Sequence, residues 1–128
     1  MILDSSAVIA ILEEEEGSDR LSAAIESSAY LGIGAPTAFE SSLVLIRDHG
    51  LVGRLALARF LDEYEVILVP FDQRHIRVAT EARLRYGKGR HPAALNYGDC
   101  MSYATATIAG APLLFVGDDF ARTDVVPV

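Results

Sequence analysis

The sequence predicts a single α/β domain in which a short, mostly parallel, twisted sheet carries helices on both faces. Short, wholly apolar runs alternate along the chain with longer segments of helical periodicity, which is the pattern of a parallel sheet. The chain has 128 residues, of which 51% are hydrophobic and 23% charged. This length fits one domain of roughly 100–200 residues, and this composition excludes an intrinsically disordered chain.

The short apolar runs predict the strands. Met1–Leu3 is wholly apolar and ends at Asp4, as expected for a buried parallel strand. Val66–Val69 is almost entirely β-branched or aliphatic and is closed by Pro70. The predicted strands are Met1–Leu3, Tyr30–Ile33, Val66–Val69 and Pro112–Val116, with a further short strand at Val125–Val128.

Helices are predicted where apolar residues recur at a spacing of three or four. Phe39, Leu43 and Ile46, for example, lie on one side of a helix that Gly50 ends. The predicted helices are Ser6–Leu12, Ser18–Ser27, Thr37–Asp48, Gly53–Tyr64, Asp72–Tyr86 and Asp99–Ala109. The remaining long segment, Gly87–Tyr97, contains two glycines and a proline and is predicted as a loop.

Charge and cysteine usage restrict the function. The net charge of −7 argues against a protein that binds nucleic acid by bulk positive charge, but permits local contacts or contacts through metal ions. The single cysteine, Cys100, cannot form an internal disulfide, which indicates a reducing compartment, and its apolar neighbours predict a buried, inert thiol. The N-terminal apolar run is interrupted by Glu13–Glu16 and is too short to span a membrane, so we expect a cytoplasmic protein with no membrane partner.

Acidic residues stand at the points where predicted strands end or helices begin. Asp4 ends the first strand, Glu40 lies near the start of a helix and Asp99 opens another. Asp118 and Asp119 follow the Pro112–Val116 strand. In an open parallel sheet these positions share one edge, and ligands bind at that edge.

Each acidic residue also has an ordinary structural explanation. Asp4 is a good helix N-cap. Thr37 and Glu40 have the spacing of a capping box, and Asp99 in a first turn favours the helix dipole. Three or four carboxylates meeting at one edge would repel one another, however, unless a cation is present. Carboxylate oxygens are ligands of Mg²⁺ or Mn²⁺.

The histidines give no sign of a zinc site. His49, His75 and His91 are scattered along the sequence, and His49 and His75 are predicted to lie on the surfaces of helices.

A basic segment precedes Asp99. Between Gln73 and Gly98 there are six basic residues and one acidic residue, a net charge of +5, which leaves −12 for the rest of the chain. This asymmetry indicates an anionic partner, with a solvated helix face as the ordinary alternative. The candidate phosphate contacts are Arg85, Lys88, Arg90 and His91, and the loop lacks the spacing of a P-loop.

Four segments together resemble the PIN-domain ribonucleases, in particular the VapC-type toxins of bacterial toxin–antitoxin pairs. Met1–Ala7 resembles the opening of that family, and Glu40 matches its second acid. The stretch Tyr86–Cys100 is similar to one that is typical of a VapC subgroup, with Asp99 as the third acid, and Pro112–Phe120 resembles the closing motif. The resemblance covers the whole chain.

The resemblance implies a three-layer α/β/α PIN-like domain over residues 1–128 that hydrolyses RNA with Mg²⁺ or Mn²⁺. It implies Asp4 and Asp99 as metal ligands, with Glu40 and Asp118 completing the site through water or around a second ion. It further implies a homodimer and a cognate VapB-type antitoxin. Gly117 stands where many relatives have a fourth acid, so Asp118 is the nearest substitute, while Asp119 matches the Asp that precedes Phe.

The basic segment and Ser6 supply the candidate substrate contacts. The four basic-segment residues above would position the RNA backbone, and Ser6 would bind a phosphate or orient Asp4. Two alternatives remain. A receiver-like signalling module would need an acidic pair after the first strand and a late lysine, but Asp4 stands alone and no lysine follows Lys88. The second alternative is a PIN-fold binding module with weak catalysis, because Gly117 stands at the position of the fourth acid.

Several helices carry more apolar residues than one buried face requires, which predicts a contact with another chain. We expect part of this surface to be a groove for an antitoxin helix, beside a homodimer contact. The residues are Val8, Ile9, Ile11, Leu12, Leu43, Val44, Leu45, Ile46, Leu55, Leu57, Phe60 and Leu61.

Overall fold

A four-stranded parallel sheet forms the centre of the molecule, which we describe from a computed structural model covering residues 1–128. The strands lie in the order β3-β2-β1-β4, and all neighbours are parallel. Their bounds are β1 Ile2–Leu3, β2 Gly32–Gly34, β3 Ile67–Val69 and β4 Leu113–Leu114. The predicted parallel sheet is therefore confirmed, although its strands are only two or three residues long.

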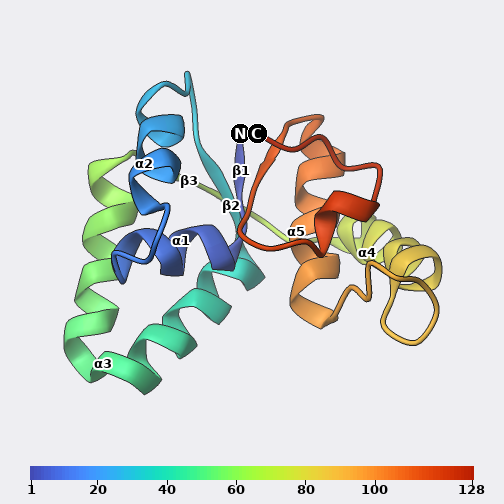
Figure 1. Ribbon diagram of the computed structural model, residues 1–128, viewed down its shortest axis with the longest axis horizontal. Coiled ribbons are helices and arrows are strands. Elements are labelled where there is room, and N and C mark those ends of the chain that lie inside the picture. The colour runs from blue at the N-terminus through green and yellow to red at the C-terminus, as the bar shows by residue number, and fades with distance from the viewer.

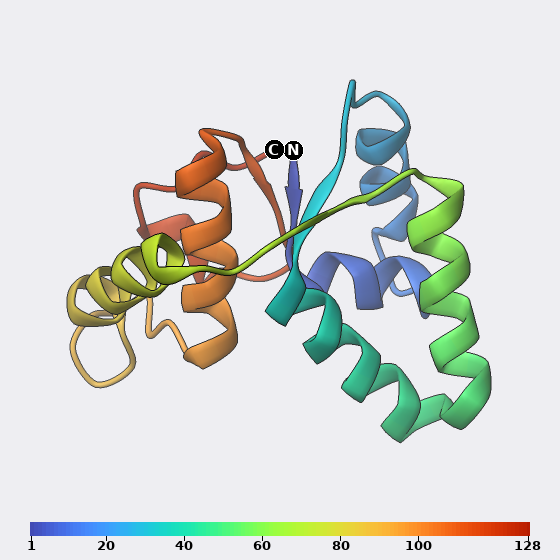
Figure 2. The same ribbon diagram turned by 180° about the vertical axis from the view of Figure 1, so that it is seen from behind.

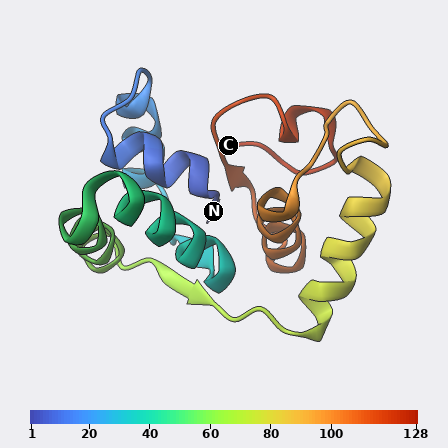
Figure 3. The ribbon, with the colours of Figure 1, turned by 90° about the horizontal axis from the view of Figure 1, so that it is seen from below.

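Helices cover the sheet on both sides, which makes the three layers of an α/β/α sandwich (Figure 1). On one side lie α1 (Ser5–Leu12), α2 (Ser18–Glu26) and α3 (Ala35–Glu63). The other side carries α4 (Gln73–Tyr86) and α5 (Tyr97–Ala109) (Figure 2). Seen from below, the chain crosses between the two layers through β3 and the segment after it (Figure 3).

Alternate residues of the strands face two separate cores. Leu3, Ile33 and Leu114 belong to the core under α1–α3, which is almost wholly aliphatic. Ile2 and Leu113 belong to the core under α4 and α5, which also contains alanines and the aromatic rings of Tyr86 and Tyr103. This alternation is the period of two expected of strands that are covered on both faces.

Helix α3 is divided by a sharp corner. Gly50, with φ 60° and ψ −137°, is not helical, so the two predicted helices meet at this residue. A Cβ at Gly53 would collide with the backbone oxygen of Leu45, so glycine allows the two halves to approach closely there. The apolar stripe of Phe39, Leu43 and Ile46 faces solvent, because Ala38, Ser41 and Leu45 on the opposite side of α3 take the buried positions.

Some predicted elements differ from the structure. Val125–Val128 forms no strand and contributes only an isolated bridge between Pro127 and Leu113. A short 3₁₀ helix, Phe120–Arg122, precedes it. Helix α5 begins two residues earlier than predicted, at Tyr97, because Asn96 caps it. None of the five α-helices combines the length with the hydropathy of a membrane-spanning segment.

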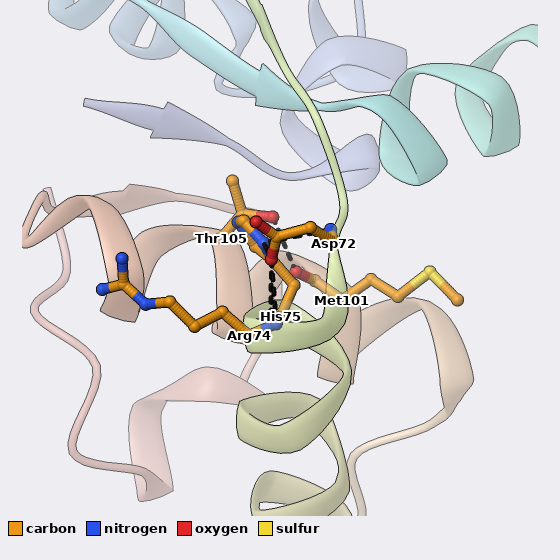
Figure 4. Close-up of polar contacts among 5 residues, drawn as sticks. All are labelled: Asp72, Arg74, His75, Met101 and Thr105. Atoms are coloured by element: carbon orange, nitrogen blue, oxygen red, sulfur yellow. Dashed lines mark hydrogen bonds and ion pairs between the residues drawn. The ribbon is translucent and has the colours of Figure 1, made fainter.

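His75 is the clearest correction. It was expected on a helix surface but is only 5% exposed. Its ring packs at a tilt against that of Phe71, with 5.0 Å between the ring centroids, and its Nδ1 lies 2.9 Å from Oδ1 of Asp72, the residue that caps α4. Figure 4 shows the ring between the start of α4 and the turn of α5 that contains Met101 and Thr105. His75 therefore anchors α4 on α5.

Candidate active site

The carboxyl edge of the sheet brings together acidic residues that are far apart in the sequence. Asp4 follows β1 directly, Glu40 lies near the start of α3 after β2, and Asp99 lies in the first turn of α5. The negative charges of Asp4, Asp119 and Glu40 all raise the pKa of Asp99, so each of these three carboxylates lies within electrostatic range of Asp99. The convergence expected from strand order is therefore present.

Asp4 is buried and held in one orientation. It is 3% exposed, and its Oδ2 accepts hydrogen bonds from the backbone N–H of Ser6 at 3.0 Å and from the Ser6 hydroxyl at 2.6 Å. The Ser6 hydroxyl in turn accepts a hydrogen bond from the N–H of Val116 at 3.0 Å. Ser6 thus orients Asp4 and ties the start of α1 to the segment after β4.

Asp99 combines a capping role with an unusual pKa. Its Oδ2 accepts from the N–H of Asn96 at 2.7 Å, and the Asn96 side chain accepts from the N–H of Asp99 at 2.9 Å, which completes a capping box. Burial, opposed by the Asn96 hydrogen bond and reinforced by the neighbouring carboxylates, raises the pKa of Asp99 to about 6. Asp99 therefore has the structural role of a capping residue and, in addition, a raised pKa that capping does not require.

Glu40 has no capping role, and the expected capping box with Thr37 is wrong. Helix α3 begins after Gly34, so Thr37 is already inside it, and the Thr37 hydroxyl lies 3.2 Å from that of Ser102 on α5. Burial and the charge of Asp4 raise the pKa of Glu40, while the Ser5 hydroxyl lowers it. Glu40 is thus a half-buried carboxylate that no helix end requires.

Gly98 lies directly against Glu40. A Cβ at residue 98 would be 2.5 Å from Oε1 of Glu40, closer than real side chains allow. Glycine here therefore makes room for the Glu40 carboxylate beside Asp99. Sequence reasoning missed this role, for which a glycine inside the first turn of a helix was the available signal.

Asp118 and Asp119 are both exposed after β4. The charge of Asp119 raises the pKa of Asp99, whereas Asp118 is not among the groups that affect it. Of the two, only Asp119 thus acts electrostatically on Asp99, while Asp118 is the residue that the sequence favoured as the fourth acid.

The donor set suits a hard divalent cation. No group of three or more acidic, histidine or cysteine side chains is close enough to enclose a metal ion. Mg²⁺ does not need such a group, because it keeps several waters and binds through one or two carboxylates and substrate phosphates. Asp4 and Asp99 each use only Oδ2 in a protein hydrogen bond, which leaves Oδ1 of both for a cation.

The basic segment divides into two groups. Lys88 and Arg90 are exposed and form no ion pair. Arg85 lies 3.2 Å from Asp124 and over the ring of Tyr86. His91 accepts a hydrogen bond at Nδ1 from the N–H of Ala93 and meets the Tyr86 ring edge-on. The structure therefore gives Arg85 and His91 internal partners and leaves the other two cations free.

Comparison with known proteins identifies the family. The PIN domain family model matches residues 1–126. Ribonuclease VapC36 of Mycobacterium tuberculosis is 44% identical over 126 residues, covering 98% of this chain and 91% of that protein. Ribonuclease VapC42 of the same organism is 43% identical over 129 residues, covering 99% of this chain and 98% of that protein.

Solved structures share the fold. M. tuberculosis VapC20, a sarcin-ricin loop cleaving toxin, matches with a TM-score of 0.80 and 18% identity, covering 99% of this chain and 97% of that one. VapBC2 from Rickettsia felis, bound to a DNA fragment from their promoter, matches with a TM-score of 0.74 and 15% identity over 98% of this chain and 94% of that one. With a family model and close relatives that span almost its full length, this chain belongs to the PIN-domain family, among the VapC ribonucleases.

Proposed function

We propose that this protein is the toxin of a toxin–antitoxin pair and acts as a Mg²⁺-dependent endoribonuclease at the acidic edge. The observation that carries the proposal is the convergence of Asp4, Glu40 and Asp99, together with a pKa of about 6 for Asp99. A carboxylate whose pKa is raised by burial and like charges is typical of a functional site. Relatives at 43–44% identity are named ribonucleases, which supports the same chemistry here.

A divalent cation explains why carboxylates are gathered in a half-buried place. We propose Asp4 and Asp99 as its protein ligands, since each has a free Oδ1. Mg²⁺, or Mn²⁺ in its place, would neutralise charge on the scissile phosphate and lower the pKa of a nearby water. Glu40 and Asp119 would support the site through water, and Asp118 is the alternative fourth acid.

The surrounding residues orient these groups and handle protons. Ser6 holds the carboxylate of Asp4 by two hydrogen bonds, and the backbone N–H of Asn96 holds that of Asp99 by one, so little rearrangement is needed when substrate arrives. The raised pKa of Glu40 makes its carboxylate a better acceptor for the proton of an attacking water. Lys88 and Arg90 would bind backbone phosphates, which sets affinity and register rather than sequence.

The activity is tested by incubating the purified protein with total bacterial RNA in Mg²⁺, Mn²⁺ or EDTA and sequencing the new RNA ends. We expect defined cleavage sites with either metal and none in EDTA. Asp4→Asn should remove cleavage, and Asp62→Asn, at an exposed acid on α3, is the matched control. Cleavage that does not depend on metal would contradict the proposed mechanism. If the wild-type protein cleaves no RNA, the proposal fails and the alternative of a binding module is favoured.

The proposed antitoxin would bind the outward side of α3. Leu43, Ile46 and Leu55 are 52%, 42% and 59% exposed, an apolar surface that water does not favour. A toxin–antitoxin complex from Klebsiella pneumoniae also matches this chain, with a TM-score of 0.72 and 19% identity over 99% of this chain and 95% of that one. Together with VapBC2 from R. felis, it supports a partner of this kind. The −12 charge outside the basic segment favours a basic partner, whose cation would suppress the acidic site.

Co-expression with the neighbouring gene tests the partner. We expect the two proteins to co-purify and the complex to be inactive on RNA. Sedimentation of the chain alone tests the proposed homodimer separately. The toxin assignment would be contradicted if the chain expressed alone is a soluble monomer, is not toxic to the cells and does not co-purify with the product of the neighbouring gene.

A further inference from the structure

A groove between α4 and α5 is not used by the acidic site. It has a volume of about 600 Å³, within the usual range of roughly 300–1,000 Å³ for ligand pockets. Ile76 and Leu84 on α4 and Met101 on α5 line it, and Tyr97 stands at the first residue of α5. Tyr97 is 81% exposed, so its ring offers an open aromatic face.

The charges that line this groove are all positive. Arg83 and Lys88 are its only charged residues, although the chain as a whole carries −7. Neither residue forms an ion pair with an acid. Arg83 is held in place by a 2.9 Å hydrogen bond from its Nη1 to the carbonyl of Leu95. An occupant should therefore combine an apolar, flat part with negative charge.

The groove also adjoins the acidic edge. Asn96 lines it, and the backbone N–H of Asn96 donates to Oδ2 of Asp99 at 2.7 Å. A ligand that reaches both places must be extended and must alternate flat rings with anionic groups. Single-stranded RNA has this character, since unpaired bases stack on aromatic side chains while phosphates contact cations.

We propose that the α4–α5 groove binds an unpaired base of the RNA strand next to the cleavage site, with Tyr97 stacking on the base and Lys88 contacting the flanking phosphate. This inference rests on the proposed ribonuclease function and extends it to a base-binding subsite. Stacking is tolerant of sequence, so the subsite selects unpaired over paired RNA more strongly than it selects one base.

Fluorescence anisotropy with a labelled short oligoadenylate tests the subsite, using Asp4→Asn so that no cleavage occurs. We expect Tyr97→Ala to weaken binding by about 5- to 100-fold and Tyr97→Phe to leave it nearly unchanged. Tyr30→Ala, at a half-exposed tyrosine outside the groove, is the matched control and should bind as before. An oligomer of the same length without bases should bind Tyr97→Ala and its parent equally.

The outcomes separate the two proposals. If Tyr97→Ala binds oligoadenylate as tightly as its parent, or loses equal affinity for the base-free oligomer, the subsite is refuted, whatever the cleavage assay shows. If Tyr97→Ala instead changes sedimentation without affecting RNA binding, the groove is a protein contact and the subsite is refuted. If the affinity loss depends on the bases but the wild-type protein cleaves nothing, the subsite stands and the nuclease proposal fails.

Discussion

The two helical layers expose apolar side chains in different electrostatic settings. On α3 the outward leucines and isoleucine lie among charges that are largely paired, as in Arg47–Asp48 and Arg59–Glu63. Between α4 and α5 the apolar groove is lined by unpaired Arg83 and Lys88. The difference teaches that exposed apolar area identifies a contact surface, whereas the charges beside it indicate the chemistry of the partner. We assign the first surface to protein and the second to RNA.

The largest expected effect comes from a change at the acidic site, which belongs to neither of these two surfaces. Asp99→Asn should lower the cleavage rate by at least about a hundredfold, because it removes a charged ligand of the proposed cation. Asparagine keeps an oxygen that accepts from Asn96 N–H, so the capping box and the fold should survive. Circular dichroism and RNA cleavage measure the two properties. Loss of helix, rather than of activity alone, would show that Asp99 is chiefly a cap.

A change on the α3 surface should affect only the protein partner. Leu55→Asp places a charge at a 59% exposed position, so the chain should still fold. We expect the affinity for the antitoxin to fall by about ten- to a hundredfold, from the loss of one buried leucine, while RNA cleavage is unchanged. Calorimetry and the cleavage assay measure these effects. A fall in cleavage would mean that the two surfaces are not independent.

Gly98→Ala should separate positioning from folding. Alanine usually stabilises a helix by roughly 0.5–1 kcal/mol relative to glycine, but here its Cβ would meet Oε1 of Glu40. The flexible Glu40 side chain must move away, so we expect cleavage to drop by about tenfold with stability kept. Thermal unfolding and kinetics test this. Undiminished cleavage would show that Glu40 does not act from its present position.

The free cations of the basic segment should produce a salt dependence. Replacing Lys88 and Arg90 with alanine should reduce the slope of log K against log salt for single-stranded RNA by up to about 0.7 for each lost contact. Arg85→Ala is the contrasting variant and should change the slope little, because Arg85 is paired with Asp124. If the wild-type protein, the double variant and Arg85→Ala all have the same slope, the basic segment is a solvated surface that does not contact RNA.

The smallest effect is a dependence of stability on pH. Because the pKa of Asp99 is about 6 in the folded protein, above its ordinary value of 3.8, the folded state binds the proton more tightly. The contribution of Asp99 to the free energy of unfolding therefore declines as pH rises from about 4 to 6. In EDTA, Asp99→Asn should gain stability over wild type across this window. A constant difference between the two proteins would contradict the raised pKa.

Much of the site was predictable because it follows from strand order. Asp4 and Asp99 follow or precede buried apolar elements, and parallel pairing places such residues at one edge. That Glu40 has no capping role was not predictable. Its spacing from Thr37 is that of a capping box, but α3 begins at Ala35, so Thr37 is not the N-cap. His75 was misplaced because its burial depends on how α4 crosses α5, a tertiary contact that no periodicity records.

The orientation of α3 was equally hidden. Phe39, Leu43 and Ile46 form an apolar stripe, and such a stripe ordinarily faces the core. Here the smaller residues Ala38 and Ser41 face inward, because α3 approaches α5 closely enough for Thr37 and Ser102 to touch. Close packing selects small side chains at this contact, and Phe39, Leu43 and Ile46 are left exposed.

The corner in α3 determines where the chain length of this fold can vary. Gly50 is exposed and not helical, so the two halves of α3 are separate helices that meet at this turn. An added residue at this turn can be accommodated in solvent. One added after Gly53 would rotate the second half by about 100° and carry Leu57 and Phe60 out of the core. Insertions and deletions among relatives should therefore collect at residues 48–52 and be absent from residues 54–61.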